Sequence, residues 1–286
     1  MIVRDRATRY WEVSREGTAL LAYPFNRAQR VEFTAGFRRV DYRTDAVEDT
    51  YRFDTGELLS RERSSGAPPA ALNLGTASAA LVYDSAIFGG ASPVRGRRYR
   101  FEAGASQGTL FYTTALADCR QYYMLARPLA LAARGLHYGR YGGGSRDGRL
   151  QELYIGYPSL VRGYSPGSFA SSECGSKPGA CPVVDRLIGR RVAVANAEIR
   201  LQVTGALGAI PARSVPPVEI APFFDAGVAW GRNGTGDVAR DAVVRSSGVS
   251  ARVNLLGFAV GQLSYVHPLD RPARSWLWEF ALLPGF

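Results

Sequence analysis

Three charged residues, one arginine and two carboxylates, are the first candidates for chemistry in this sequence. Arg162 lies in the segment Val161-Arg162-Gly163-Tyr164, and Glu198 and Asp225 lie on the polar faces of the next two alternating segments. A guanidinium group beside two carboxylates forms charge-assisted hydrogen bonds and holds both carboxylates ionised. We therefore expect a cluster that anchors the long segment after Arg162, and not an acid–base pair. A structural ion pair in any water-filled barrel would give the same pattern.

A hydrolase is the alternative that the same region suggests. Residues 163–167 (Gly-Tyr-Ser-Pro-Gly) fit the G-x-S-x-G template, and Asp225 and His267 follow in the order of a catalytic triad. The residue after the nucleophile must donate its N–H to the oxyanion, and Pro166 has no N–H. We therefore predict no catalytic residue and no enzyme activity.

The cysteines and histidines favour a disulfide over a metal site. Cys174 and Cys181 lie seven residues apart in a Gly-, Ser- and Pro-rich segment, where they could form a disulfide in an oxidising compartment. His137 and His267 are the only histidines, too few and too far from the cysteines for a zinc site. We expect neither a metal nor a cofactor.

The composition favours an aromatic- and glycine-rich β protein. The chain contains 32 Gly, 15 Tyr and 13 Phe, and no apolar run approaches the 18 residues of a membrane-spanning helix. The net charge of +10 comes from arginines spread along the chain, since Lys177 is the only lysine. Such an even spread gives no basic patch, and we expect no nucleic-acid partner.

Alternation of apolar and polar residues is the main structural signal, and helical periodicity is nearly absent. The clearest alternating segments are residues 31–37, 98–105, 193–202, 249–255 and 276–282. Such segments run to about 8–14 residues, and a tilted strand needs about 9–11 to cross a bilayer. Counting them gives about 12–13 strands. We predict an all-β fold, a transmembrane antiparallel β-barrel with a polar interior.

The connections favour the same fold. Residues 23–27 and 254–257 leave room only for tight turns, whereas residues 140–149, 165–189 and 231–246 form long polar loops. Short turns at one end and long loops at the other are typical of outer-membrane barrels. We found no linker, so residues 1–286 are expected to form one barrel domain.

The C-terminus resembles the terminal strand signal of bacterial outer-membrane barrels. Trp276, Trp278 and Phe280 share one face, and the chain ends in Phe286. Such an apolar edge would aggregate in water, so we expect it to close the barrel against the first strand.

The order of these motifs resembles the BamA/TamA-type family, the bacterial surface antigen barrels. The resemblance is clearest over residues 153–286 and looser from about residue 22. It implies that Arg162 lies at the tip of a lumen loop and contacts Glu198 and Asp225. Gly163 and Tyr164 complete the loop motif, and Gly227 completes the strand motif.

The resemblance also implies a 16-stranded barrel preceded by an N-terminal periplasmic module. By comparison with that pattern, we expect the first strands and the module to be missing from these residues. Residues 1–10 have no signal-peptide core, so a longer protein is expected. The implied location is integral, in the bacterial outer membrane.

The function implied is insertion of outer-membrane proteins or translocation of polypeptides. The partners would be outer-membrane lipid, nascent outer-membrane or secreted polypeptides, and periplasmic chaperones or accessory lipoproteins. Weak pairing of the first and last strands would let a client strand join the edge, and Pro284 would weaken that pairing. The alternatives are a surface-display barrel for a fused passenger domain and a passive pore or structural barrel.

Overall fold

The fold is known from a computed structural model, which describes residues 2–174, 181–205, 209–210, 216–231, 242–255 and 257–284. Almost every regular element in this part of the chain is a β-strand. Within these ranges, none of the helices has the length and apolar character needed to cross a membrane. The elements are β1 (Ile2–Pro24), β2 (Gln29–Arg52), β3 (Leu58–Ser65), β4 (Leu72–Asp84), β5 (Ile87–Phe88), β6 (Pro93–Gly108), β7 (Tyr112–Ala126), β8 (Leu129–Tyr141), η1 (Gly143–Arg146), β9 (Leu153–Tyr154), η2 (Ser171–Glu173), α1 (Pro182–Asp185), β10 (Ile188–Gly189), β11 (Arg191–Gln202), β12 (Val218–Trp230), β13 (Val244–Leu255), β14 (Ala259–Pro268) and β15 (Leu277–Pro284).

A single curved antiparallel sheet of 13 strands contains most of these elements. The hydrogen-bonded order is β1-β2-β4-β6-β7-β8-β11-β12-β13-β14-β15, with β3 added to β2 and β5 added to β6. Neighbouring strands follow one another along the chain, which is the order of an up-and-down barrel. The predicted all-β antiparallel fold is confirmed, and so is the strand count.

The strand faces follow the predicted alternation. In β11 the side chains of Val194, Glu198 and Gln202 are buried on the inner face, whereas Ile199 and Leu201 are exposed on the outer face. In β13, Ser250, Arg252 and Asn254 lie inward. A polar inner face with an apolar outer face is the arrangement of a barrel that contacts lipid outside and water inside.

The sheet curls but its two edges stay unpaired. β1 hydrogen-bonds to β2 and β15 hydrogen-bonds to β14, and within the described ranges β1 and β15 do not pair with each other. The expected closure of the last strand against the first is therefore not seen. Pairing of β15 with β14 extends to Pro284, which lies opposite Ala259.

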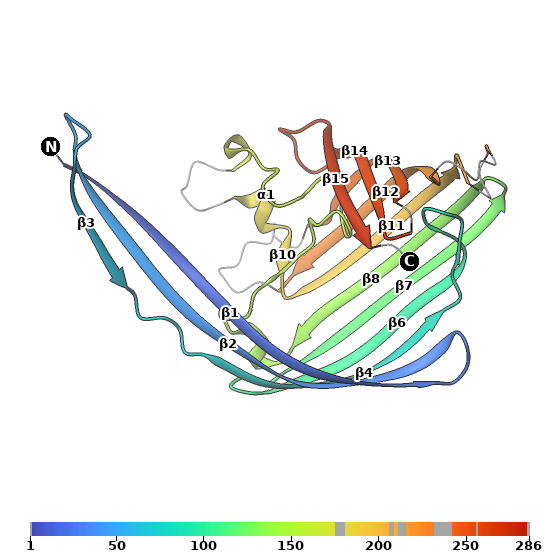
Figure 1. Ribbon diagram of the computed structural model, residues 1–286, viewed down its shortest axis with the longest axis horizontal. Helices are drawn as coiled ribbons and strands as arrows, with labels where there is room; N and C mark the ends of the chain where they lie inside the picture. Colours follow the sequence, from blue (N-terminus) through green and yellow to red (C-terminus); the bar gives the residue numbers. More distant parts are fainter. Residues whose placement is uncertain are drawn as a thin grey trace.

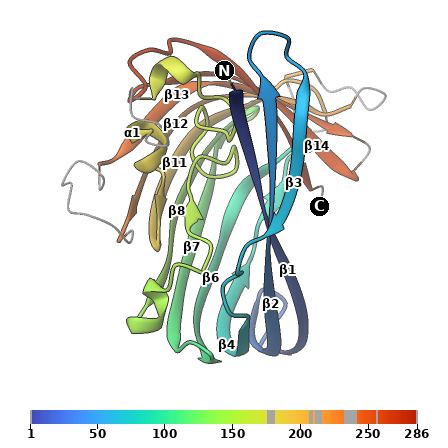
Figure 2. The same cartoon turned by 90° about the vertical axis from the view of Figure 1, so that its left-hand side faces the viewer.

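The two ends of the sheet differ in their connections. Short turns join β1 to β2, β7 to β8 and β13 to β14 at one end, which we call the turn end. The other end, the loop end, carries the long connection of residues 142–190 between β8 and β11. This loop folds back onto the concave side of the sheet (Figures 1 and 2).

A three-stranded projecting ribbon extends the sheet at the loop end. It consists of residues 2–13, 41–52 and 58–65, where β2 pairs with β1 on one side and β3 on the other (Figure 1). At a rise of about 3.3 Å per residue, 12 residues extend about 40 Å. β1 and β2, at 23 and 24 residues, are therefore much longer than predicted. Both faces of the ribbon carry charges, so its sequence has no apolar alternation to mark its length.

Candidate functional site

The long loop reaches the lumen because part of it packs as a small apolar core. Ile155, Val161 and Tyr164 are fully buried against inward residues of β11, β12 and β13, with Val192 and Val194 among them. The backbone N–H of Val161 donates to the carbonyl of Ile155 over 3.1 Å, which closes a tight turn before Arg162. The loop motif is thus held by packing on both sides of the arginine.

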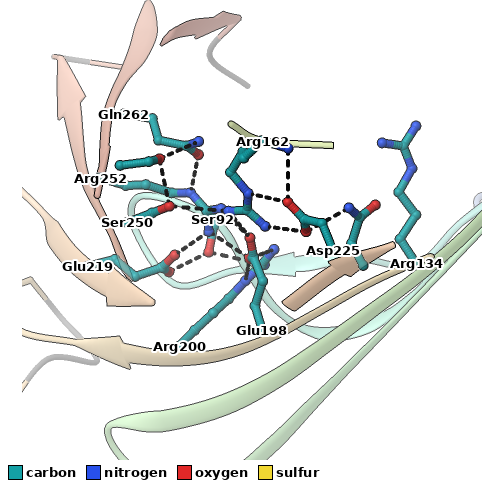
Figure 3. Close-up of polar contacts among 12 residues, drawn as sticks. Ser92, Arg134, Arg162, Glu198, Arg200, Glu219, Asp225, Ser250, Arg252 and Gln262 are labelled. Carbon is teal, nitrogen blue, oxygen red and sulfur yellow. Dashed lines mark hydrogen bonds and ion pairs between the residues drawn. The ribbon is translucent and has the colours of Figure 1, made fainter. Parts of the chain in front are cut away.

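Arg162 is brought together with both carboxylates that the sequence singled out (Figure 3). Its Nε and Nη2 donate to the two carboxylate oxygens of Asp225, each over 2.7 Å, which is a bidentate pair. Its Nη1 donates to Glu198 Oε1 over 2.9 Å and to the Ser250 hydroxyl over 3.2 Å. The guanidinium carbon lies 3.5 Å from the ring centroid of Phe223. Arg162 is only 3% exposed and Asp225 is fully buried.

The cluster is larger than the sequence predicted, because two further arginines share the carboxylates. Arg252 donates to both oxygens of Glu198, over 2.6 and 2.9 Å, and to Glu219 over 2.8 Å. Arg200 donates to Glu198 from its Nε over 2.8 Å and to the Pro93 carbonyl over 2.7 Å. Arg252 and Glu219 could have been found from alternation, since each has the inward parity of its strand.

Charge in this cluster is balanced. Three arginines (Arg162, Arg200 and Arg252) are paired with three carboxylates (Glu198, Glu219 and Asp225). Because all these side chains are largely buried, each charge depends on its partners and not on water for stabilisation. We name these six side chains the lumen anchor. Their ion pairs can hold a loop in place.

The glycines of both motifs lie where a side chain would collide. Gly163 has φ of +88°, and a Cβ on it would lie 2.8 Å from Cγ1 of Val266. A Cβ on Gly227 would lie 2.6 Å from Cγ2 of Val161 and 3.1 Å from Cδ1 of Ile155. Both glycines therefore let the loop approach the strands closely.

Tyr164 completes the loop motif from the other side. Its hydroxyl donates to the Arg245 carbonyl over 2.8 Å and accepts from the Asp270 N–H over 3.3 Å. Burial raises the pKa of Tyr164 to about 12, so the hydroxyl keeps its proton and remains a donor.

The residues of the alternative hydrolase arrangement do not form a catalytic group. The Ser165 hydroxyl bonds Glu279, Asp225 is held by Arg162, and His267 Nδ1 lies 2.6 Å from the Ser275 carbonyl oxygen. His267 also stacks on Trp276 at 5.1 Å between ring centroids, on the outer face.

The aromatic residues of the terminal strand lie on the outer face. Trp278 and Phe280 are 67% and 68% exposed, and Trp276, just before β15, stacks on Tyr265 at 4.6 Å. Exposed aromatic rings suit a surface covered by lipid. Phe286 lies outside the described residues.

The remaining sequence candidates are the two loop cysteines. The sulfur atoms of Cys174 and Cys181 are 2.07 Å apart, the distance of a disulfide bond. Across the described ranges, no group of three or more His, Cys, Asp or Glu side chains could hold a metal ion.

A cavity of about 620 Å³ lies beside the lumen anchor. The charged side chains along its wall are Arg98, Arg120, Arg134, Arg162, Glu198, Arg200 and Arg252. Arg120 and Arg134 share Asp118, over 2.7 and 2.9 Å. The lumen beside the loop therefore carries several arginine side chains.

Comparison with known proteins gives a family and a fold. The Omp85 superfamily domain matches residues 4–273. No curated protein matches the sequence significantly. Among solved structures, the crystal structure of BamA from Haemophilus ducreyi lacking POTRA domains 1-3 is similar, with a TM-score of 0.54 and 13% sequence identity. The match covers 96% of this chain and 62% of that one.

These findings agree with the order of strands, the polar inner face and the anchored loop. Since the domain match spans nearly the whole sequence, the chain belongs to the Omp85 superfamily, and its sheet is that of an antiparallel transmembrane β-barrel.

Proposed function

We propose that residues 1–286 act as one barrel domain of the bacterial outer membrane, which inserts outer-membrane proteins or translocates polypeptides. One observation carries the proposal: the buried Arg162 cluster fixes a loop inside the barrel, beside a terminal strand whose outer edge is free of pairing with any described strand. Membership of the Omp85 superfamily supports it.

The free edge of β15 is the surface where a client would bind. An unpaired strand edge presents alternate N–H and C=O groups that a second strand can complete. The outer face of β15 is apolar and suits lipid, whereas its inner face carries Glu279 toward the loop. The partners proposed are lipid and nascent polypeptides, delivered by periplasmic chaperones or with the help of accessory lipoproteins.

The test is folding of a client into vesicles that contain the purified chain. The probe is a urea-unfolded outer-membrane barrel protein, and its folding is followed by the gel mobility of unheated samples. Vesicles with the wild-type chain should fold the client faster than empty vesicles, and Arg162→Ala should lose most of that gain. Arg39→Ala, which changes a half-exposed arginine far from the lumen anchor, should retain it.

Two results would contradict the proposal. One is equal folding rates in wild-type and empty vesicles. The other is steady conductance in planar bilayers that Arg162→Ala leaves unchanged, combined with no effect on the client, which would favour a passive pore.

A further inference from the structure

The backbone of Gly163 is bound from both sides by the β14–β15 hairpin. Its N–H donates to the Glu279 carboxylate, over 3.2 Å to Oε2. Its carbonyl accepts from Nη1 of Arg271 over 2.7 Å. The hydroxyl of Ser165 also donates to Glu279. Thus the loop tip next to Arg162 contacts the terminal strand as well as β11 and β12.

Arg271 extends this contact over the rest of the loop. It is 1% exposed, and it bonds Glu173 through its Nε and Nη2, each over 2.8 Å. It also donates to the Ser168 hydroxyl and carbonyl, each over 3.0 Å, and lies over the Phe169 ring at 4.1 Å. One side chain of the β14–β15 connection thus joins three separate loop positions.

The hydrogen-bond donors to the Glu279 carboxylate come from the loop. It is 7% exposed, and among the described residues no arginine or histidine nitrogen lies within salt-bridge distance of its carboxylate. A buried carboxylate without hydrogen-bond donors is costly, so the loop donors at Gly163 and Ser165 are what stabilise it there. Without the docked loop, strand β15 would gain nothing from a carboxylate at this position.

We propose that Arg271 and Glu279 form a clamp that makes the terminal strand move with the long loop. The loop is then a bridge: Arg162 fixes it to Glu198 and Asp225 on β11 and β12, and the clamp fixes it to β15. Both clamp residues are positioning residues, and through them the loop sets the place of the β15 edge. This role at the edge rests on the proposed function, whereas the coupling itself does not.

The first test measures hydrogen exchange in the purified chain in lipid, without any client. Glu279→Ala should speed exchange of the loop tip and of β15 by about tenfold, as expected when buried hydrogen bonds are lost. Glu279→Gln keeps an acceptor for the Gly163 N–H and should stay within about threefold of wild type. Glu102→Ala removes an inward carboxylate of β6 that pairs with Arg100, and should leave both segments unchanged.

A second pair of variants tests the arginine. Arg271→Ala should speed exchange in both segments, whereas Arg274→Ala, an exposed arginine of the same connection, should not. If Glu279→Ala and Arg271→Ala change exchange only within the β14–β15 hairpin and leave the loop tip as in wild type, the clamp does not exist.

The decisive experiment asks whether a change at Arg162 reaches β15 through the loop. Arg162→Lys weakens the opposite attachment of the loop and should raise exchange in β15, which the loop contacts through Gly163. In a Glu279→Ala background the same change should no longer affect β15. Unchanged exchange of β15 in Arg162→Lys would overturn the coupling, even if the chain assembles clients. Coupling without client folding would instead contradict the proposed function alone.

Discussion

At the scale of single residues, the lumen anchor depends on charged side chains that are largely buried. Arg162 gives four of its N–H groups to Asp225, Glu198 and Ser250, and its backbone N–H also lies 3.2 Å from Asp225. Such a group is costly to remove, because the carboxylates that it leaves behind stay buried.

Arg162→Ala should therefore destabilise the chain by about 3–5 kcal/mol, the range for breaking a buried ion pair by removing one partner. Arg39→Ala removes a half-exposed surface pair and should cost at most about 1 kcal/mol. Urea unfolding in lipid, followed by tryptophan fluorescence, measures both. Equal losses in the two variants would show that the lumen anchor does not contribute as a buried cluster.

Gly227 controls the same anchor through packing. Gly227→Ala would push on Val161, directly before Arg162, and should cost about 1–3 kcal/mol, as overpacked sites do. Gly135→Ala is the matched control, because a Cβ there meets no atom within 4 Å and the residue also lies in a strand. The same unfolding experiment compares the two. A Gly227→Ala chain as stable as wild type would mean that Val161 and the loop can shift without loss of stability.

At the scale of elements, the Glu173–Arg271 pair makes the docking of the loop dependent on pH. Hydrogen bonds from Arg271 hold the pKa of Glu173 below its ordinary value of 4.5. A lowered pKa in the docked state means that the pair contributes fully above pH 4.5 and loses its contribution as pH falls through the lowered value.

Loop amides of residues 168–173 should thus keep constant protection, corrected for intrinsic exchange, from pH 7 to about 4.5 and lose it below. Glu173→Gln has no titrating group at this position, so its loop amides should be less protected and their protection should change less with pH. The measurement is hydrogen exchange at several pH values. Identical profiles for the two chains would show that another carboxylate controls the loop.

Strand positions could be predicted from the sequence because their signal is local. The alternation at 193–202 and 249–255 gave the right strands and the right inward faces, since side-chain direction in a strand has a period of two. The ribbon was missed because residues 41–52 carry charges on both faces. Arg271 and Glu279 were missed because their contacts with Gly163 join residues 108 and 116 positions apart. Such contacts depend on how the loop folds back into the lumen, and the local sequence pattern does not predict the path of the loop.

At the scale of the whole molecule, the antiparallel order places the two ends of the sheet on opposite sides of the membrane. The turn of residues 53–57 and the connection of residues 269–276 belong to the loop end, whereas residues 25–28 and 257–258 belong to the turn end.

Single cysteines at Asp54 and Arg274 should therefore react alike with an impermeant maleimide, and so should cysteines at Asn26 and Phe258. The free Cys119 is first changed to serine. One pair should be labelled in intact cells and the other only after the membrane is permeabilised. Equal labelling of all four in intact cells would contradict a membrane-spanning sheet.

The charge balance of the lumen anchor has an electrical consequence. The six side chains are neutral together, but Arg162 alone belongs to the loop, so undocking the loop would carry a positive charge along the barrel axis. A full charge moved through 100 mV is worth about 2.3 kcal/mol, comparable to the loss of a buried hydrogen bond. An applied voltage of one polarity would therefore favour undocking of the loop, and a voltage of the opposite polarity would favour the docked state. Recordings in planar bilayers should then show a polarity-dependent transition that Arg162→Ala removes.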